Sequence, residues 1–307
     1  PPLARKRVFA ALGNNITTAT FAAATISVTL PPSPPTVSQP SPATLTVTSG
    51  QNASFSVILG GNPTPTVKWQ KMTAAPNTWS DLVNAGRISG ATTVDLLITG
   101  ALVADAGAYR AVANNSQGTT EGASAGLTVD RANQSITFNA LPARTFNPAA
   151  NTFTLSATGG GSLQPVTFTS SDPAIVTIAD GNSATIHRAG NVTITASQAG
   201  NDDYNPATPF PQSLVINRAT AGFTVSGLAQ VYDGTPKPVT VVTTPVGLPV
   251  IVTYNGNATV PISAGSYAVA VTVDETATPN YTGSAPPATL VIAKAQQTIT
   301  FPTIADK

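Results

Sequence analysis

One sequence element occurs three times in the chain, as Leu127-Thr128-Val129-Asp130-Arg131-Ala132, Leu214-Val215-Ile216-Asn217-Arg218-Ala219 and Leu290-Val291-Ile292-Ala293-Lys294-Ala295. Each copy has large apolar residues two positions apart, which is the side-chain period of a β-strand. The copies begin 87 residues (127 to 214) and 76 residues (214 to 290) apart, about the length of one small β-sandwich. The element therefore predicts tandem domains that are each closed by the same kind of strand.

A second element precedes each closing strand, as Ala106-Gly107-Ala108-Tyr109, Ala189-Gly190-Asn191-Val192 and Ala264-Gly265-Ser266-Tyr267. Its glycine allows a tight corner, and the alternation that follows is typical of a penultimate strand. An opening strand is repeated as well, because Gln134-Ser135-Ile136-Thr137-Phe138 recurs as Gln297-Thr298-Ile299-Thr300-Phe301. The two repeats together predict that a further domain opens after the third closing strand.

These repeats divide the chain into domains. We expect residues 1–30 to be the final strands of a truncated domain of the same kind and residues 31–35, which are Pro-Pro-Ser-Pro-Pro, to be a semi-rigid linker. Three complete domains are expected at 36–131, 132–219 and 220–295, and residues 296–307 are expected to begin another, incomplete repeat. Short junctions and proline favour an elongated rod of order 100 Å, given ~3.3 Å per strand residue.

The composition excludes several classes of function. Charged residues make up 9% of the 307, and the net charge is +1, so nothing favours nucleic acid or an anionic membrane surface as a partner. The chain has no cysteine, which excludes thiol catalysis, zinc–thiolate sites and iron–sulfur clusters. No apolar run reaches the roughly 18–20 residues that a membrane helix needs. With 27 prolines, 24 glycines and many Thr/Val alternations, the sequence predicts an all-β fold.

Residues 36–131 resemble an I-set-like immunoglobulin domain. Trp69 in Val67-Lys68-Trp69-Gln70 matches the core tryptophan of that family, and Tyr109 matches its tyrosine-corner residue. The family's two cysteine positions are occupied by Val57 and Ala111. The resemblance implies a sandwich without its disulfide, in which packing around Trp69 carries more of the stability.

The next two domains resemble repeats of large bacterial surface proteins. Residues 132–219 are similar to bacterial immunoglobulin-like repeats through Gln134–Phe138 and Ala199-Gly200-Asn201-Asp202-Asp203-Tyr204-Asn205. Residues 220–295 are similar to MBG-type repeats through Tyr232-Asp233-Gly234-Thr235-Pro236-Lys237. The resemblance implies an extracellular location, on the cell surface or secreted, and carries no activity that could be transferred.

The residues do not assemble a catalytic motif. The one histidine, His187, has no Gly-x-Ser-x-Gly partner, and 11 aspartates and two glutamates are scattered over several domains. We therefore predict that the chain is not an enzyme, with no catalytic, cofactor-binding or metal residues and no cofactor. Asn201-Asp202-Asp203 groups oxygen ligands as calcium requires, but offers few of the six to eight it takes, so a polar turn anchored by Tyr204 is the favoured interpretation.

The leading hypothesis for function is a non-catalytic stalk or adhesive segment whose partners are the neighbouring repeats of its own chain. One alternative is a module that recognises host or matrix glycan or protein. Its best candidate residue is Trp79, expected in a loop, although packing of Trp79 at a sheet edge is favoured. The other alternative is a fibre subunit, in which residues 296–305 are donated as an edge strand to an incomplete domain of a neighbouring chain.

Overall fold

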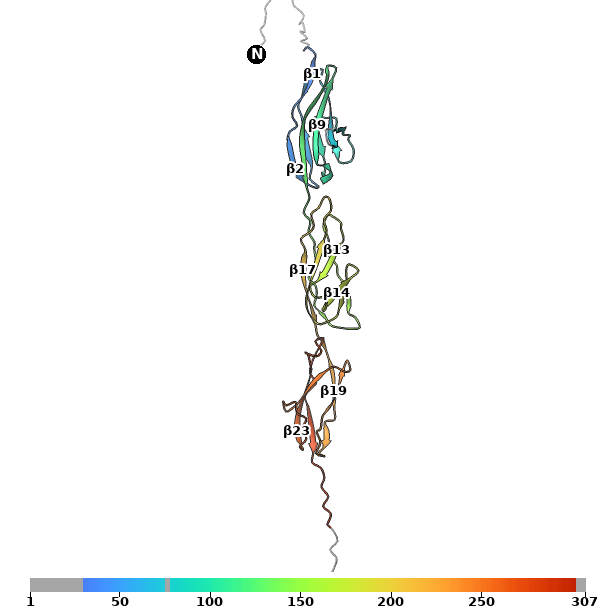
Figure 1. Cartoon of the computed structure of the whole chain (residues 1–307), viewed down its shortest axis with the longest axis vertical. Helices are drawn as coiled ribbons and strands as arrows, with labels where there is room; N and C mark the ends of the chain where they lie inside the picture. The colour runs from blue at the N-terminus through green and yellow to red at the C-terminus, as the bar shows by residue number, and fades with distance from the viewer. Residues whose placement is uncertain (1–29, 75–77, 302–307) are drawn as a thin grey trace, which may run out of the picture. The chain divides into compact units, whose positions relative to one another are not determined.

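The protein is described by a computed structural model that covers residues 30–74 and 78–301. In this part of the chain the regular elements are strands, apart from one 3-10 turn, η1 (Val103–Asp105), so the predicted all-β class is confirmed. The strands form a first, a middle and a third β-sandwich, which are seen in blue to green, yellow and orange in Figure 1. None of the described residues form a helix of the length and apolarity that crossing a bilayer takes. The strands predicted within residues 1–29 lie outside the described residues.

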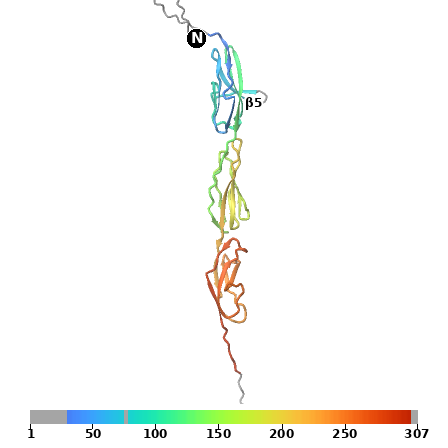
Figure 2. The same ribbon diagram turned by 90° about the vertical axis from the view of Figure 1, so that its left-hand side faces the viewer.

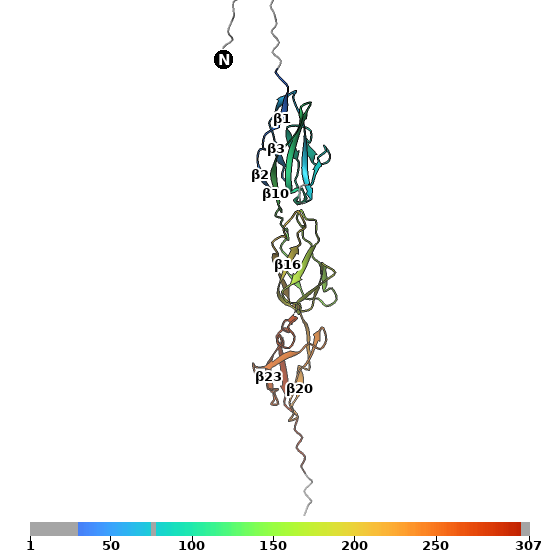
Figure 3. The ribbon, with the colours of Figure 1, turned by 45° about the horizontal axis from the view of Figure 1, so that its top comes forward.

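The first sandwich contains three sheets. The five-stranded sheet has the order β2 (Thr44–Thr48), β10 (Gly118–Asp130), β9 (Gly107–Asn115), β5 (Thr66–Ala74) and β6 (Thr78–Asp81). The three-stranded sheet has the order β3 (Ala53–Ser56), β8 (Asp95–Ile98) and β7 (Ile88–Ser89), and β1 (Ser33–Val37) pairs with β4 (Leu59–Asn62). Figure 2 shows β5 extending beyond the body of this sandwich, and Figure 3 shows β2 beside β10, with which it pairs in parallel.

An aromatic cluster fills the core of the first sandwich. Trp69 on β5 is 0% exposed, and its ring lies 6.4 Å from that of Phe55 on β3, so the cluster joins two sheets. The ring of Phe55 also stacks on that of Tyr109, with centroids 5.8 Å apart. The indole nitrogen of Trp69 donates a 2.9 Å hydrogen bond to the carbonyl of Thr93, which satisfies its one polar atom. Val57 and Ala111, at the two cysteine positions, are both buried.

Two expectations for this sandwich differ from the structure. The alternation of Phe55-Ser56-Val57-Ile58-Leu59 in the sequence predicts a single strand, but β3 ends at Ser56 and β4 begins at Leu59 in another sheet. The expected linker at residues 31–35 is not wholly a linker, since β1 begins at Ser33 and pairs with β4. The side chain of Ser33 accepts a hydrogen bond from the Asn62 backbone, and proline is tolerated on such an edge strand because no ladder donor is required there.

The middle sandwich consists of two sheets around one core. The four-stranded sheet has the order β11 (Arg144–Thr145), β17 (Phe210–Asn217), β16 (Gly190–Gln198) and β13 (Val166–Ser170), and the three-stranded sheet has the order β12 (Thr152–Thr154), β15 (Ser183–Ile186) and β14 (Val176–Ala179). Ile136 and Phe138 of the opening segment are buried in the core, together with Leu214 and Ile216 of the closing strand β17. Both repeated elements of the sequence therefore contribute to the same core.

The third sandwich is built around the closing strand β25 (Ala288–Ala293). Its four-stranded sheet has the order β20 (Ala229–Val231), β25, β23 (Gly265–Val273) and β22 (Val250–Tyr254), and Figure 3 labels β20 and β23. β19 (Gly222–Ser226) pairs with β21 (Thr240–Thr244), and β18 (Ala219–Thr220) pairs in parallel with β24 (Tyr281–Thr282). Leu290 and Ile292 are buried in this core, at the positions that correspond to Leu214 and Ile216.

The sandwiches do not coincide with the compact units of the chain. One unit comprises Thr44–Ala53, Ile98–Gly107 and Gly126–Lys307, so the end of the first sandwich that carries Ser49 and Val103 is part of the same unit as the middle and third sandwiches. Residues 297–301, expected to be an opening strand, do not form a strand. In that segment Ile299 is 76% exposed and Phe301 is 84% exposed.

Candidate functional site

The titratable residues considered for catalysis do not converge. His187 is exposed, and its Nε2 lies 2.8 Å from Oγ1 of Thr177 on β14 rather than beside a carboxylate. Within residues 30–74 and 78–301, no three His, Cys, Asp or Glu side chains are grouped so that they could hold a metal ion. Paired carboxylates across a cleft, as glycoside hydrolysis uses, would need two acids on opposite walls of one cavity.

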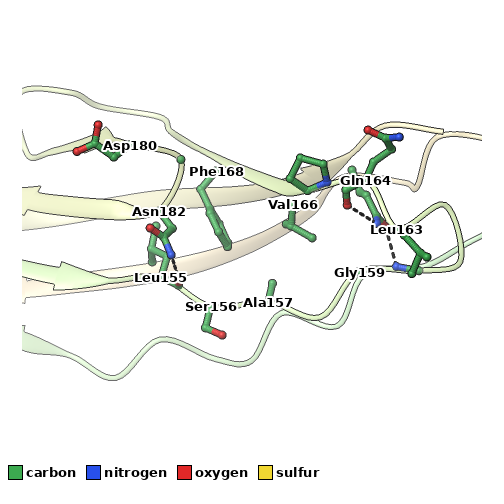
Figure 4. A pocket seen from close by; sticks show the side chains of 14 residues that line it. Leu155, Ser156, Ala157, Gly159, Leu163, Gln164, Val166, Phe168, Asp180 and Asn182 are labelled. Carbon is green, nitrogen blue, oxygen red and sulfur yellow. Dashed lines mark hydrogen bonds between the residues drawn. The ribbon is translucent and has the colours of Figure 1, made fainter. Parts of the chain in front are cut away.

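A hollow of about 550 Å³ lies in the middle sandwich. Figure 4 shows Asp180 at one end of it and Gln164 at the other, with Leu155, Val166 and Phe168 between them. Asp180 is the one carboxylate among its lining residues. The amide of Gln198, which also lines the hollow, accepts from the Gly160 backbone and donates to the Gln164 carbonyl. The polar groups thus hold the Gly159–Gly161 turn, and a single acid offers no acid–base pair.

In the loop considered for calcium, one side-chain oxygen of Asn201 and one of Asp203 are engaged in hydrogen bonds. Oδ1 of Asn201 accepts from the backbone nitrogens of Asp203 and Tyr204, both at 2.9 Å. Oδ1 of Asp203 accepts from the backbone nitrogen of Val103 at 2.8 Å and from Oγ of Ser49 at 3.2 Å. A calcium ion would need these same lone pairs, so the arrangement supports the interpretation as a polar turn.

Trp79 lies in strand β6 and not in a loop as expected. β6 is the edge strand of the five-stranded sheet, where Trp79 faces Met72 of β5 in the ladder. The guanidinium carbon of Arg110, on β9, lies 4.4 Å from the centre of the indole ring, which is the geometry of a cation–π contact. Arg110 is in turn fixed by a hydrogen bond to Gln70 and a bidentate contact with Glu121.

A polar groove of about 330 Å³ lies beside this stack on the same sheet. We call it the polar groove, and it is lined by Thr66, Val67, Lys68, Gln70, Val112, Asn114, Thr119 and Glu121. At its margin, hydrogen bonds from Lys68 and then Gln70 hold the pKa of Asp81 below its usual value. Hydroxyls, amides and charges next to an aromatic ring are the groups that recognise sugars or peptides, so the polar groove and Trp79 form the candidate binding site of the chain.

Sequence reasoning selected Trp79 but missed the residues around it. Arg110, Gln70 and Glu121 come from three strands and are brought together only by the sheet register, in which Gln70 pairs with Arg110. The available signal was the period-2 spacing of Lys68 and Gln70, whose side chains share a sheet face opposite to that of Trp69.

The chain folds as tandem immunoglobulin-like β-sandwiches. Residues 35–129 match the immunoglobulin I-set domain model, and residues 221–296 match the MBG domain model. The chain thus contains an I-set immunoglobulin domain and an MBG domain, as the resemblances implied.

Known proteins resemble parts of the chain. Endoglucanase C of Cellulomonas fimi is 30% identical over 171 residues, which cover 52% of this chain and 15% of that protein. Among solved structures, a complex of titin and obscurin-like 1 immunoglobulin domains is 31% identical over 31% of this chain and 93% of that one, with a TM-score of 0.26. A titin I-band fragment is 14% identical and covers 86% of this chain and 99% of its own, with a TM-score of 0.30.

Proposed function

We propose that this chain is a non-catalytic structural segment, a stalk or spacer, of a bacterial cell-surface or secreted protein. The observation that supports this most is that the first and second closing strands, β10 and β17, each run directly into the next sandwich. Ala132, two residues after β10, bridges Tyr204 of the middle sandwich, and Ala219, two residues after β17, pairs with Tyr281 of the third. Load applied along the chain therefore passes from one hydrogen-bonded sandwich to the next without a long unstructured linker.

Stretching a single molecule tests the spacer function. Each sandwich has its own core and is expected to unfold in a separate event. Modules of 76 to 95 residues, the lengths of the matched domains, release about 250–340 Å of chain each at 3.3–3.6 Å per residue. A single event that releases the whole chain at once would contradict separate load-bearing modules.

A second candidate function is recognition of a polysaccharide at the polar groove and Trp79. It is favoured by the Arg110–Trp79 stack beside the groove and by the partial likeness to an endoglucanase, whose name refers to the cleavage of glucans. Affinity electrophoresis in soluble carboxymethyl cellulose tests it. Retardation of the chain that is lost in Trp79→Ala and kept in Val83→Ala, an exposed residue two positions beyond β6, would support binding. Equal mobility with and without the polymer would exclude this glucan.

The fibre is a third proposal. It is supported by the exposure of Ile299 and Phe301, whose counterparts Ile136 and Phe138 are 5% and 3% exposed in the middle core. A donated strand would bury them in a neighbouring chain. Light scattering over a range of concentrations separates the outcomes, because a constant monomer mass excludes strand donation.

A further inference from the structure

The two junctions inside the larger compact unit are built in the same way. At the first junction, the backbone nitrogen of Ala132 donates to the carbonyl of Asp203 at 2.9 Å. At the second, Ala219 donates to the carbonyl of Asn280 at 2.9 Å. Each loop has an Asp or Asn followed by tyrosine, so we call Asp203-Tyr204 and Asn280-Tyr281 the Asx-Tyr loops.

At each junction, an arginine directly after the closing strand donates a hydrogen bond to the following sandwich. Nε of Arg131 donates to the carbonyl of Asp202 at 3.2 Å, and Nε of Arg218 donates to the carbonyl of Pro279 at 3.0 Å. In both cases the acceptor is the residue just before the Asx-Tyr pair. The Arg-Ala pair that follows β10 and β17 therefore links each of these closing strands to the next sandwich by hydrogen bonds.

The Asx side chain reaches back to the preceding sandwich. Oδ1 of Asp203 accepts from the backbone nitrogen of Val103, and Oδ1 of Asn280 accepts from that of Ala189, both at 2.8 Å. Val103 and Ala189 both lie in the segment before a penultimate strand, β9 or β16. Because the donor is a backbone N–H, the preceding sandwich needs no particular side chain there, whereas the loop needs an Asp or Asn.

The surface that receives the Asx-Tyr loop, which we call the seat, includes one further position. Each closing strand pairs in parallel with another strand, and the residues that follow these partner strands are Ser49, Phe146 and Tyr232. Each of the three donates its backbone nitrogen to the carbonyl of the last residue of the closing strand, namely Asp130, Asn217 and Ala293. Ser49 Oγ touches the Asx side chain at the first junction. The ring of Phe146 meets that of Tyr281 edge-on at the second, with centroids 5.7 Å apart.

The third sandwich has the same seat, and no described residue occupies it. A hollow of about 660 Å³ is lined by Tyr232, Ser263, Ala264, Lys294, Ala295 and Gln297. Tyr232 corresponds to Phe146 and Lys294 to Arg218, while Ala264 precedes Gly265 as Ala189 precedes Gly190. Tyr232 is 42% exposed, although it occupies the position where Phe146 is covered by an aromatic partner.

We propose that this hollow is a docking site for the Asx-Tyr loop of another immunoglobulin-like module, of the kind formed by residues 132–219. The Asx oxygen accepts from the backbone at Ser263 or Ala264, the tyrosine packs on Tyr232, and Lys294 holds the preceding carbonyl. The proposal does not depend on the spacer function, since a recognition module in tandem would need the same junction.

Two extended chains test the docking site. In one, residues 139–219 are added directly after Phe301, so that Gln297–Phe301 opens a second copy of the middle module. In the other, residues 220–295 are added directly after Ala295. Amide hydrogen exchange followed by NMR is expected to show at least about tenfold slower exchange at Ser263 or Ala264 than in the unextended chain.

The matched controls change only the added loop. Asp203→Ala in the first added copy, or Asn280→Ala in the second, is expected to restore fast exchange at Ser263 and Ala264. An added copy that does not fold lacks slowly exchanging core amides of its own, and the other extension then decides. A folded copy that leaves both amides unprotected overturns the proposal.

The unextended chain offers an independent check. Asn280→Ala is expected to speed exchange of the Ala189 amide about tenfold while the Val103 amide is unchanged, and Asp203→Ala is expected to do the reverse. If neither substitution changes its target amide, the Asx side chain does not hold the junction and the proposed seat has no basis.

Discussion

The two tryptophans of the chain allow a stringent test of how the first sandwich is stabilised. Both are in this sandwich, so tryptophan fluorescence reports its unfolding alone, even in the full chain. Trp69 is 0% exposed, and burial of a tryptophan side chain removes about 150–250 Å² from water. At about 25 cal/mol per Å² this is worth about 4–6 kcal/mol, an upper bound because the unfolded chain already buries part of that area.

We therefore expect Trp69→Ala to lower the free energy of unfolding by about 4 kcal/mol, including the lost hydrogen bond to Thr93. Trp79→Ala is the matched control, because it removes the same side chain from the sheet edge and loses a cation–π contact of about 0.5–1 kcal/mol. In each variant the remaining tryptophan reports the urea midpoint. Equal shifts in the two variants would refute the argument that the aromatic core carries the stability in place of a disulfide.

Three further predictions concern the middle and third sandwiches. Leu214→Ala, at a fully buried site, is expected to cost about 2–5 kcal/mol in thermal unfolding, whereas Val215→Ala on the exposed side of the same strand should cost under about 1 kcal/mol. Gly200→Ala is expected to destabilise the middle sandwich by about 1–3 kcal/mol, since its Cβ would lie 2.2 Å from the backbone oxygen of Tyr204, and an unchanged melting temperature would contradict this. The hydrogen bond from Lys237 holds the pKa of Asp233 below its ordinary value of 3.8. The ionised Asp233 therefore stabilises the fold fully above pH 3.8, and this stabilisation is lost as the pH falls toward the lowered pKa. Between about pH 2 and 5, the melting temperature should fall less with decreasing pH in Asp233→Asn than in the unchanged chain.

Local patterns of the sequence were sufficient for the cores. Leu214 and Ile216 share a face of β17, and Leu290 and Ile292 share one of β25, because the side-chain period of a strand places alternate residues together. Trp69 and Tyr109 were identified through the resemblance to an I-set domain, and both are buried.

Features that depend on long-range register could not be read in this way. The break after Ser56 follows from the pairing of β4 with β1, about 25 residues earlier in the chain, and no local signal marks it. Trp79 was expected in a loop, with packing at a sheet edge as the favoured interpretation, and its pairing with Met72 places it on an edge strand. The contacts of Arg110 with Gln70 and Glu121 join three strands and become visible only in the folded sheet.

The junctions show why the same closing element was detectable three times. Its alternating apolar residues are constrained by a core, but Arg131, Arg218 and Lys294 lie beyond the strands and outside any core. A core alone would not require a basic residue at that position. Arg131 and Arg218 both bind a carbonyl of the following sandwich, which gives the position a physical reason. The repeat in the sequence therefore reflects two requirements at the first two junctions, one for closing a sandwich and one for joining it to the next, and Lys294 occupies the corresponding position beside the hollow of the third sandwich.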